Sequence, residues 1–342
     1  MTAALEIIAP GMRTTLQDLG RTGYQKLGVP TAGALDPVSL RIANLLVGNR
    51  PGEAALEISY LGPTIEVMAA SVRIALAGSA IGVDVTRDGE SWRVPSCQSV
   101  RLRQGDQLRV GGFGDTTVAY LAVEHGFDIA PVLGSLSTFI MATLGGFHGR
   151  ALRAGDMLPL RRDTADARDE VRLSPPARPR PARFRVVLGP QHDLFTPAQI
   201  GTFLSATYKV AQTSDRMGMR LEGPALDHTI SLISDGSAPG AIQVPGNGLP
   251  IVLLADRGTT GGYPKIATVV SADLAALGRL LPGAPIGFEA VSVADAEAAR
   301  RTLEASIIAL RSQLQPVRDG GGVALDALFS HNLISGVVSA DT

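Results

Sequence analysis

The sequence contains 342 residues, 45% hydrophobic and 18% charged, with a formal net charge of −1. This composition excludes a disordered chain and suits two globular domains. A charge this close to zero gives no overall basic field for nucleic acid, and no apolar run approaches the roughly 18 residues of a membrane span. The lone Cys97 and the widely spaced histidines predict neither a disulfide nor a metal site. The start, MTAALEIIAPG, lacks the regions of a signal peptide, so we expect a cytoplasmic protein.

Short β-like runs dominate the first half of the chain, and several are continuous apolar stretches of the kind found in buried strands. We expect strands at residues 4–9, 54–59, 64–68, 71–77, 107–112 and 117–123. One helix interrupts them: Asp36 is suited to cap it, Pro37 to occupy its first position and Gly48 to close it.

Residues 161–182 are charged and then proline-rich, with few large apolar side chains, which predicts an extended linker. Beyond it we expect strands at 183–189, 250–256 and 266–272. Helices are expected to begin after Thr196, Ser271 and Ser292. The last helix is the longest and has an apolar stripe that we expect to pack against this chain rather than a partner. The stripe comprises Leu303, Ile307, Leu310 and Leu314.

The pattern Leu-Arg-x-Gly-Asp-x-Leu occurs at residues 102–108 and 152–158, and 280–286 is a looser third copy. A glycine turn before a strand that starts apolar predicts a tight β-hairpin corner. We therefore predict a mainly β fold with a few helices (α+β), built from two related barrel-like domains. The predicted segments are a first domain at 1–160, a linker at 161–182, a second domain at 183–291, a C-terminal amphipathic helix at 292–315 and a tail at 316–342.

The stretch ADRGTTGGYPKIA, residues 255–267, has the glycines of a phosphate-binding loop. It does not match the Walker A or dinucleotide-binding patterns, because Lys265 follows proline and no Gly-x-Gly-x-x-Gly is present. Backbone amides, hydroxyls, a lysine and an acid could still hold and act on an anion. The residues concerned are Asp256, Thr259, Thr260, Gly261, Gly262 and Lys265. The alternative is a tight connection between strands in which Lys265 is merely solvated.

Two further groups of polar residues are candidates for binding. Arg216 and Arg220 stand four residues apart, just after Ser214, and two guanidinium groups suit a carboxylate or phosphate. The alternative is a pair of surface contacts, Arg216 with its neighbour Asp215 and Arg220 with Glu222.

Gln243 and Asn247 bracket Pro245. Their amides are suited either to recognising a lactam or ureido group or to capping the turn itself. The residues alone do not choose between these interpretations.

Three blocks of the sequence, at 14–49, at 189–196 with 214–224, and at 240–274, resemble one family. It is the family of allophanate hydrolase subunit 2, or urea amidolyase carboxyltransferase domains, whose members include the C subunit of 5-oxoprolinase and KipA-like proteins. The blocks stand in the family's order and spacing. Two positions differ: Gly258 stands where the family usually has Gln, and Pro245-Gly246-Asn247-Gly248 replaces Pro-Pro-Asn-Gly.

The resemblance implies two cyclophilin-like β-barrel domains related by internal duplication. It also implies partners, a subunit-1/KipI-like protein (the B subunit of 5-oxoprolinase) and the A subunit of that enzyme, and it implies no nucleic acid or membrane. As leading function it implies the ATP-dependent opening of 5-oxo-L-proline to L-glutamate. Lys265, Asp256 and Arg216 are then the expected catalytic residues, with Asp256 as the base. Expected binding residues are Arg220, Ser214, Gln243, Asn247, Thr259, Thr260, Gly261, Gly262 and Tyr263.

In the first domain the resemblance includes Arg21 and Tyr24, which are expected to line either the cleft or a partner interface. The resemblance also leaves two other functions open. One is carboxyl transfer from biotin on a separate carrier to urea or a related amide. The other is a KipA-like regulator that binds its partner without turnover.

Overall fold

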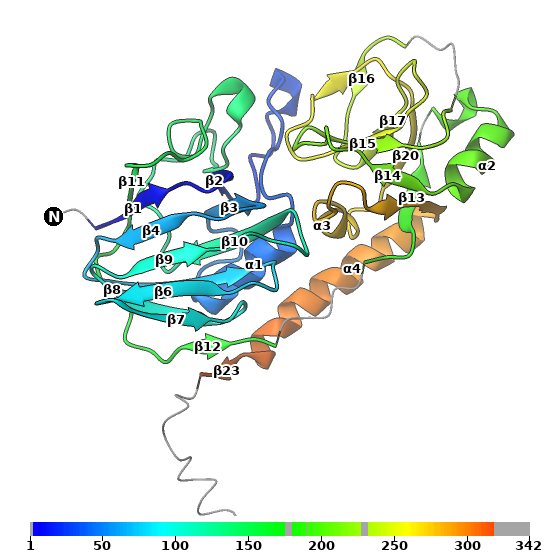
Figure 1. Cartoon of the computed structure of the whole chain (residues 1–342). Coiled ribbons are helices and arrows are strands. Elements are labelled where there is room, and N and C mark those ends of the chain that lie inside the picture. The colour runs from blue at the N-terminus through cyan, green and yellow to red at the C-terminus, as the bar shows by residue number, and fades with distance from the viewer. Residues whose placement is uncertain (1–2, 175–179, 190, 227–231, 318–342) are drawn as a thin grey trace, which may run out of the picture.

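The computed structural model of the chain describes residues 3–174, 180–189, 191–226 and 232–317. Figure 1 shows two β-rich bodies side by side, with one long helix running along both. The α-helices within the described ranges are α1 (Pro37–Leu46), α2 (Pro197–Ser205), α3 (Leu274–Leu277) and α4 (Val293–Ala309). Short 3-10 helices occur at Gln25–Leu27, Ile140–Ala142, His192–Leu194 and Leu310–Gln313. The predicted mainly β fold with a few helices is confirmed.

The first domain consists of two antiparallel sheets that share one hydrophobic core. In spatial order, one sheet contains β11 (Met157–Pro159), β1 (Ala4–Ala9), β4 (Thr64–Val67), β9 (Gln107–Val110), β6 (Val83–Arg87) and β7 (Glu90–Val94). The other contains β2 (Arg13–Gln17), β3 (Ala55–Ser59), β10 (Val118–Val123), β5 (Ser71–Ala77) and β8 (Ser99–Arg103). Every strand predicted in this half lies within one of these sheets.

The second sheet is buried on both faces, which explains its continuous apolar runs. Along β10, Leu121 points into the core between the sheets, whereas Tyr120 and Ala122 face α1. Ile307 and Leu310 from the end of α4 and the following turn pack into this outer layer. The apolar stripe predicted on the last helix therefore packs against this chain, as expected.

The second domain contains one eight-stranded sheet. Its strands, in spatial order, are β21 (Pro285–Ile286), β14 (Tyr208–Val210), β15 (Gly218–Glu222), β18 (Ile251–Leu253), β17 (Ala241–Gln243), β20 (Lys265–Val269), β13 (Phe184–Leu188) and β22 (Phe288–Ala290). The two edge strands, β21 and β22, are separated by a single residue of chain, so the sheet must curl around its core until its edges almost meet. The result is a nearly closed barrel. Its strand order differs from that of the first domain, and the internal duplication stays an expectation.

The Leu-Arg-x-Gly-Asp-x-Leu repeats form matching turns. Gly105 and Gly155 have φ of +85° and +84°, a conformation that glycine adopts without strain. The prediction of a hairpin is wrong for the first copy, because β8 and β9 belong to different sheets. This turn instead carries the chain across the core from one sheet to the other.

The segment predicted as an extended linker lies against the first domain for much of its described length. β12 (Val171–Arg172) pairs with β23 (Gln315–Pro316), the strand that follows α4. The fully buried Arg73 donates to Glu170 and to the backbone carbonyls of Asp166 and Arg168. A buried guanidinium needs several acceptors, and the linker supplies them. Residues 175–179 and 318–342 of the predicted linker and tail lie outside the described residues.

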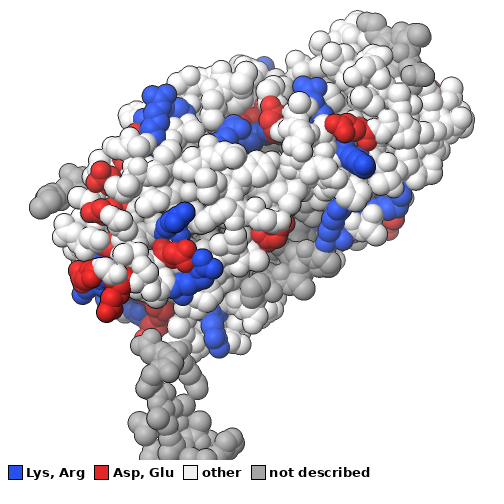
Figure 2. All heavy atoms as spheres, viewed as in Figure 1, with Lys and Arg blue, Asp and Glu red and all other residues white. Residues whose placement is uncertain are grey.

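The helix caps follow the sequence, with one exception. Asp36 accepts hydrogen bonds from the amides of Val38 and Ser39, and Ser292 accepts one from Asp295. The helix expected after Ser271 is only one turn long, α3, and begins after Asp273, whose carboxylate pairs with Arg185 at 2.5 Å and makes no cap hydrogen bond. None of the helices in the described ranges has the length and apolar character to cross a bilayer. On the face seen in Figure 2, basic and acidic side chains are interspersed.

Candidate functional site

The glycine loop of residues 258–262 lies beside a small two-stranded sheet of the second domain. In it, β19 (Thr260–Gly261) pairs with β16 (Asp235–Gly236), and Asp235 stands opposite Gly261. A Cβ on Gly261 would lie 2.5 Å from Nε2 of Gln243 and 3.6 Å from Oγ of Ser237. A side chain at this position would therefore displace the end of Gln243, and both polar side chains lie beside Gly261.

Lys265 reaches the same small sheet. It starts β20 beside Gln243, its register partner on β17, so the two side chains share one face. The side chain is buried, and Nζ lies 3.2 Å from Oδ2 of the exposed Asp235, at ion-pair distance. Lys265 is the main cause of the lowered pKa of the Asp235 carboxyl. Gln191 braces the pair, because its amide accepts from the Lys265 backbone and donates to Asp235.

Arg257 is the residue of this region that sequence reasoning missed. It is only 1% exposed, and Nε donates to the carbonyl of Ser237 at 3.1 Å. Its Nη1 and Nη2 have no hydrogen-bond partner among the described residues, and neither does Oγ of Ser237. Burial lowers the pKa of Arg257. The only available signal was its position inside the glycine-rich stretch, directly after Asp256.

We call Ser237, Gln243, Arg257 and Lys265, gathered around Gly261, the donor cluster. It contains two buried cations, and among the described residues the one carboxylate paired with it, Asp235, is exposed. Buried donors that are fixed in place interact strongly with negative charge, because little solvent screens them. The donor cluster is therefore suited to binding an anionic oxygen group.

Arg216 and Asp256 lie between the two domains. The guanidinium of Arg216 contacts both carboxylate oxygens of Asp256, at 2.8 and 2.9 Å. It also pairs with Glu57 on β3 of the first domain and donates to the carbonyl of Gly33 at 2.6 Å. Burial lowers the pKa of Arg216, but the carboxylates of Glu57 and Asp256 outweigh it and raise the pKa overall.

The two residues predicted as catalytic base and anion ligand are thus each other's partners. The surface pairing considered for Arg216 is wrong, because its acids are Glu57 and Asp256, while Asp215 accepts from nearby backbone amides. Glu57 was not identified from the sequence, where it reads as one polar residue in an apolar strand.

Arg21 is a second incompletely paired arginine, in the first domain. It is 1% exposed and donates to the carbonyl of Ser137, while Nε and Nη1 have no partner among the described residues. Burial lowers the pKa of Arg21, and the charges of Asp18 and Asp256 oppose this. Arg21 is therefore within electrostatic reach of the domain junction. Tyr24 is half-buried and precedes a 3-10 turn, without a side-chain cap hydrogen bond.

The other predicted residues are more exposed. Asn247 accepts from the backbone of Leu249, as a turn-capping amide does, and Ser214 accepts from the backbone of Arg220. Tyr263 is half exposed. Thr259, Thr260 and Gly262 lie along the loop without deep burial.

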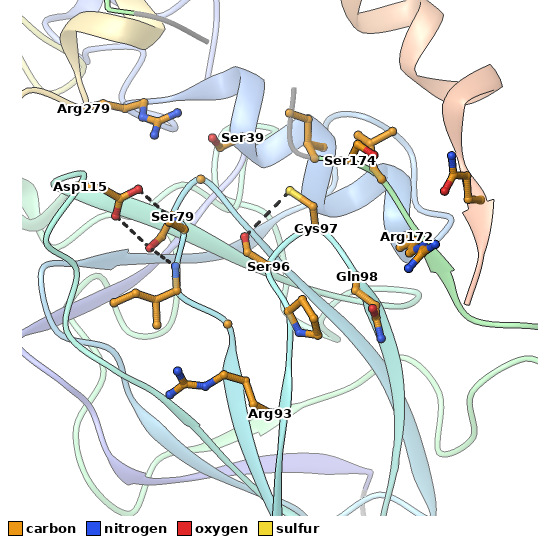
Figure 3. A pocket seen from close by; sticks show the side chains of 18 residues that line it. Ser39, Ser79, Arg93, Ser96, Cys97, Gln98, Asp115, Arg172, Ser174 and Arg279 are labelled. Carbon is orange, nitrogen blue, oxygen red and sulfur yellow. Dashed lines mark hydrogen bonds between the residues drawn. The ribbon is translucent and has the colours of Figure 1, made fainter. Parts of the chain in front are cut away.

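The larger hollows of the described residues lie outside the donor cluster, and two of them concern the predicted residues or the domain junction. One, of about 300 Å³, opens between the domains and is lined by Arg13, Tyr60, Ser214 and Arg216, among others. The other, of about 900 Å³, is shown in Figure 3 beside Cys97, Asp115 and Arg279. Figure 3 shows Asp115 turned toward Ser79 and the adjacent backbone amide rather than into open space. The larger hollow contains none of the predicted site residues.

Within the described residues, one set of side chains could in principle hold a metal ion: Glu124, His125 and Asp166. Arg73 and Arg168 already donate to Glu124, and His125 lies 3.2 Å from Asp166. Two guanidinium groups thus already supply positive charge at the only buried carboxylate of this set. We assign no metal to it.

Comparison with known proteins identifies relatives of the whole chain. A family profile described as "Carboxyltransferase domain, subdomain A and B" matches residues 27–290. The C subunit of Escherichia coli 5-oxoprolinase is 38% identical over 303 residues, which cover 87% of this chain and 94% of that protein.

Larger proteins match over a part of their length. The urea amidolyase of Saccharomyces cerevisiae is 32% identical over 333 residues, 90% of this chain but 18% of that protein. The crystal structure of the Kluyveromyces lactis urea carboxylase superimposes with a TM-score of 0.80 at 29% identity, over 93% of this chain and 31% of that one. This chain therefore spans less than a third of these multidomain relatives.

Proposed function

The chain belongs to the carboxyltransferase domain family, subdomains A and B, and from this membership we propose that it is the C subunit of an ATP-dependent 5-oxoprolinase. The observation that carries the proposal is the 38% identity to the C subunit of E. coli 5-oxoprolinase over 94% of that protein's length. In this proposal the chain works in the cytoplasm with the KipI-like B subunit and the A subunit of the same enzyme. The assembly opens 5-oxo-L-proline to L-glutamate while ATP is hydrolysed.

The donor cluster has the positive charge and the hydrogen-bond donors that this reaction would require. A lactam is a poor electrophile, and ATP would supply the phosphoryl group that turns its oxygen into a leaving group. The protein must then stabilise negative charge that builds up on oxygen. Lys265 provides a buried positive charge, and Gln243 and Ser237 provide donors beside Gly261. We assign Lys265 the catalytic role.

Arg216 and Asp256 receive a positioning role in this proposal. Asp256 is the residue directly before Arg257, and its two oxygens are occupied by Arg216. The ion pair holds the turn after β18 that leads to Arg257, and through Glu57 it links this turn to the first domain. A proton-accepting role for Asp256 would require it to exchange this partner.

Carboxyl transfer is the second candidate, favoured by the description of the family profile and by the identity to urea amidolyase. Here the donor cluster would hold the carboxyl group brought by biotin on a separate carrier protein. The chemistry of the cluster suits either anion, so an assay must distinguish them.

The test is reconstitution with the neighbouring subunits. We expect ATP hydrolysis that depends on 5-oxo-L-proline and releases L-glutamate, and Lys265→Met should lower kcat about 10²-fold or more, as loss of a charge-stabilising donor does. Lys209→Met is the matched control, because Lys209 is exposed on β14 and should leave kcat unchanged.

Other results would redirect the assignment. Turnover of urea with a biotinylated carrier, without turnover of 5-oxoproline, would establish the carboxyltransferase instead. Binding of a KipI-like partner without turnover of either substrate, unaffected by Lys265→Met, would indicate the regulator.

A further inference from the structure

Arg257, like Arg21, has more hydrogen-bond donors than the described residues accept. Its side chain is 1% exposed, yet within the described part of the chain the only acceptor of its guanidinium is the carbonyl of Ser237. Removing a charge from water is costly unless acceptors replace the water. For Arg73 and Arg216, several acceptors within the chain replace the water. No described residue supplies such acceptors to Nη1 and Nη2 of Arg257, so these two donors are available to an acceptor brought by a ligand.

The orientation of Arg257 defines which acceptor fits. Nε is fixed on the Ser237 carbonyl at 3.1 Å, which leaves Nη1 and Nη2 as two donors in one plane. Such a pair matches the two oxygens of a carboxylate. Oγ of Ser237, on the residue that anchors Nε, is a further donor without a partner among the described residues.

Arg257 and Lys265 contact different residues near Gly261. Ser237 Oγ and Gln243 Nε2 both lie against Gly261, and Lys265 reaches Asp235 on the strand opposite Gly261. Arg257 therefore approaches from the Ser237 side and Lys265 from the Asp235 side.

We propose that Arg257, assisted by Ser237, binds the carboxylate of the substrate and so selects cyclic amides that carry a carboxylate over neutral amides such as urea. This inference rests on the proposed function for the identity of the substrate, 5-oxo-L-proline. Lys265 is left to act at the amide oxygen. Arg257 is then a specificity-determining residue, because a neutral substrate would leave its buried charge without an acceptor.

The test compares two lactams on the full chain and on the reconstituted complex. 5-Oxo-L-proline carries the carboxylate, and 2-pyrrolidinone has the same ring without it. We expect 5-oxo-L-proline to raise the Tm and to bind at least 100-fold more tightly than 2-pyrrolidinone. Inorganic phosphate and biotin carboxylated on its carrier are further arms, since each presents oxyanion chemistry to the same donors. Tighter binding of either than of 5-oxo-L-proline would overturn the assignment to a substrate carboxylate.

Variants of Arg257 separate binding from folding. Arg257→Met keeps the length of the side chain and removes the charge, so it should abolish the preference for 5-oxo-L-proline without changing the affinity for 2-pyrrolidinone. Its Tm without ligand should equal or exceed that of the wild type, because a buried charge without acceptors is removed. Arg257→Lys keeps the charge without the fork and should raise KM about 10-fold or more with little change in kcat. Arg109→Met, at an exposed arginine on β9, is the control.

A purely structural role for Arg257 gives the opposite pattern. Arg257→Met would then lower the Tm sharply, and Arg257→Lys would retain the preference for 5-oxo-L-proline; either result overturns the proposal. Failure of the proposed function is distinguishable: the complex would show no ATP hydrolysis with 5-oxoproline, whereas the Arg257-dependent preference for the carboxylate would persist in the titrations.

Discussion

Arg216 gathers acceptors from both domains around one buried guanidinium. Asp256 and Glu57 supply the carboxylates, and Gly33 supplies a carbonyl. Tyr120 donates to the other oxygen of Glu57 at 2.6 Å, which extends the network beneath α1. The guanidinium and the two carboxylates depend on one another, because all three are buried and little solvent screens them.

The first prediction concerns this residue. Arg216→Ala should reduce the free energy of unfolding by about 3–5 kcal/mol, because it leaves the carboxylates of Glu57 and Asp256 buried without their partner. Arg220→Ala, four residues along and exposed, should change it by no more than about 0.5 kcal/mol. Urea unfolding followed by circular dichroism measures both. Equal losses in the two variants would contradict the structural role of Arg216.

Sequence reasoning at this scale selected the stretch in which the donor cluster lies, but it did not give the state of each side chain. The glycine-rich stretch and Lys265 were selected because glycines, hydroxyls and a lysine suit an anion. Arg216 and Arg257 cannot be ranked in this way, since both are arginines beside an acid in a polar stretch. Only the fold decides that Glu57, distant in sequence, meets Arg216 and that no described residue meets the terminal nitrogens of Arg257.

At the level of elements, the two Leu-Arg-x-Gly-Asp-x-Leu turns share one internal arrangement. In each, the aspartate accepts from the amide of the arginine three residues earlier, Asp106 from Arg103 and Asp156 from Arg153, both at 2.8 Å. A second arginine then pairs with each aspartate, Arg87 with Asp106 and Arg150 with Asp156. The repeat was visible in the sequence because the turn needs both a glycine and an acceptor; the pairing arginines come from outside the pattern.

These turns predict an acid sensitivity. Arg150 lowers the pKa of Asp156, against the effect of burial; burial raises the pKa of Asp106, but Arg87 and the Arg103 amide lower it overall. A folded-state pKa below the unfolded value of about 3.9 stabilises the fold above that pH, and this stabilisation is lost as the pH falls through the folded pKa.

The second prediction is that Arg150→Met flattens this acid dependence. The variant should lose about 1 kcal/mol of stability near pH 6 and progressively less as the pH falls through the lowered pKa of Asp156, where the carboxylate is protonated. Arg153→Met is the control, because Arg153 contributes its backbone amide to the turn while its side chain is exposed. Chemical denaturation at a series of pH values tests this. A loss in Arg150→Met that is independent of pH would show that the ion pair is not its cause.

The predicted helix starts are confirmed where the capping side chain bonds to its own helix. The prediction was less accurate at α3, where the residue before the helix bonds to a distant residue instead. Asp36 and Ser292 cap α1 and α4 as their positions indicate. The helix expected after Ser271 instead follows Asp273, whose carboxylate pairs with Arg185 of β13 and does not cap it. The sequence around Asp273 cannot predict its contact with Arg185, because the two residues are far apart in the chain.

At the scale of the whole molecule, the two domains meet along α3 as well as through Arg216. Gly278, at the end of α3, lies against Leu35 of the first domain, and its carbonyl accepts from Thr117 at 2.7 Å. Ala275 packs into the layer beneath α1. Both domains and their mainly β character were predictable from alternating and continuous apolar runs. This contact was not, because a glycine in an apolar helix gives no sign that another domain lies against it.

The last prediction tests whether this contact makes the two domains unfold together. A Cβ on Gly278 would lie 2.6 Å from the carbonyl oxygen of Leu35, whereas its own backbone, at φ −59°, accepts any residue. Gly278→Ala should therefore act only as a wedge between the domains, costing about 1–3 kcal/mol.

We expect calorimetry to show a single unfolding transition in the wild type and two separated transitions in Gly278→Ala. Gly201→Ala is the matched control, since no atom lies within 4 Å of its added Cβ in the middle of α2; it should raise the stability by up to about 1 kcal/mol. If Gly278→Ala still unfolds in one transition at the wild-type temperature, the contact between Gly278 and Leu35 does not contribute to the coupling of the two domains. The coupling would then have to come from Arg216 and from the packing of α4, because both also link the two domains across the junction.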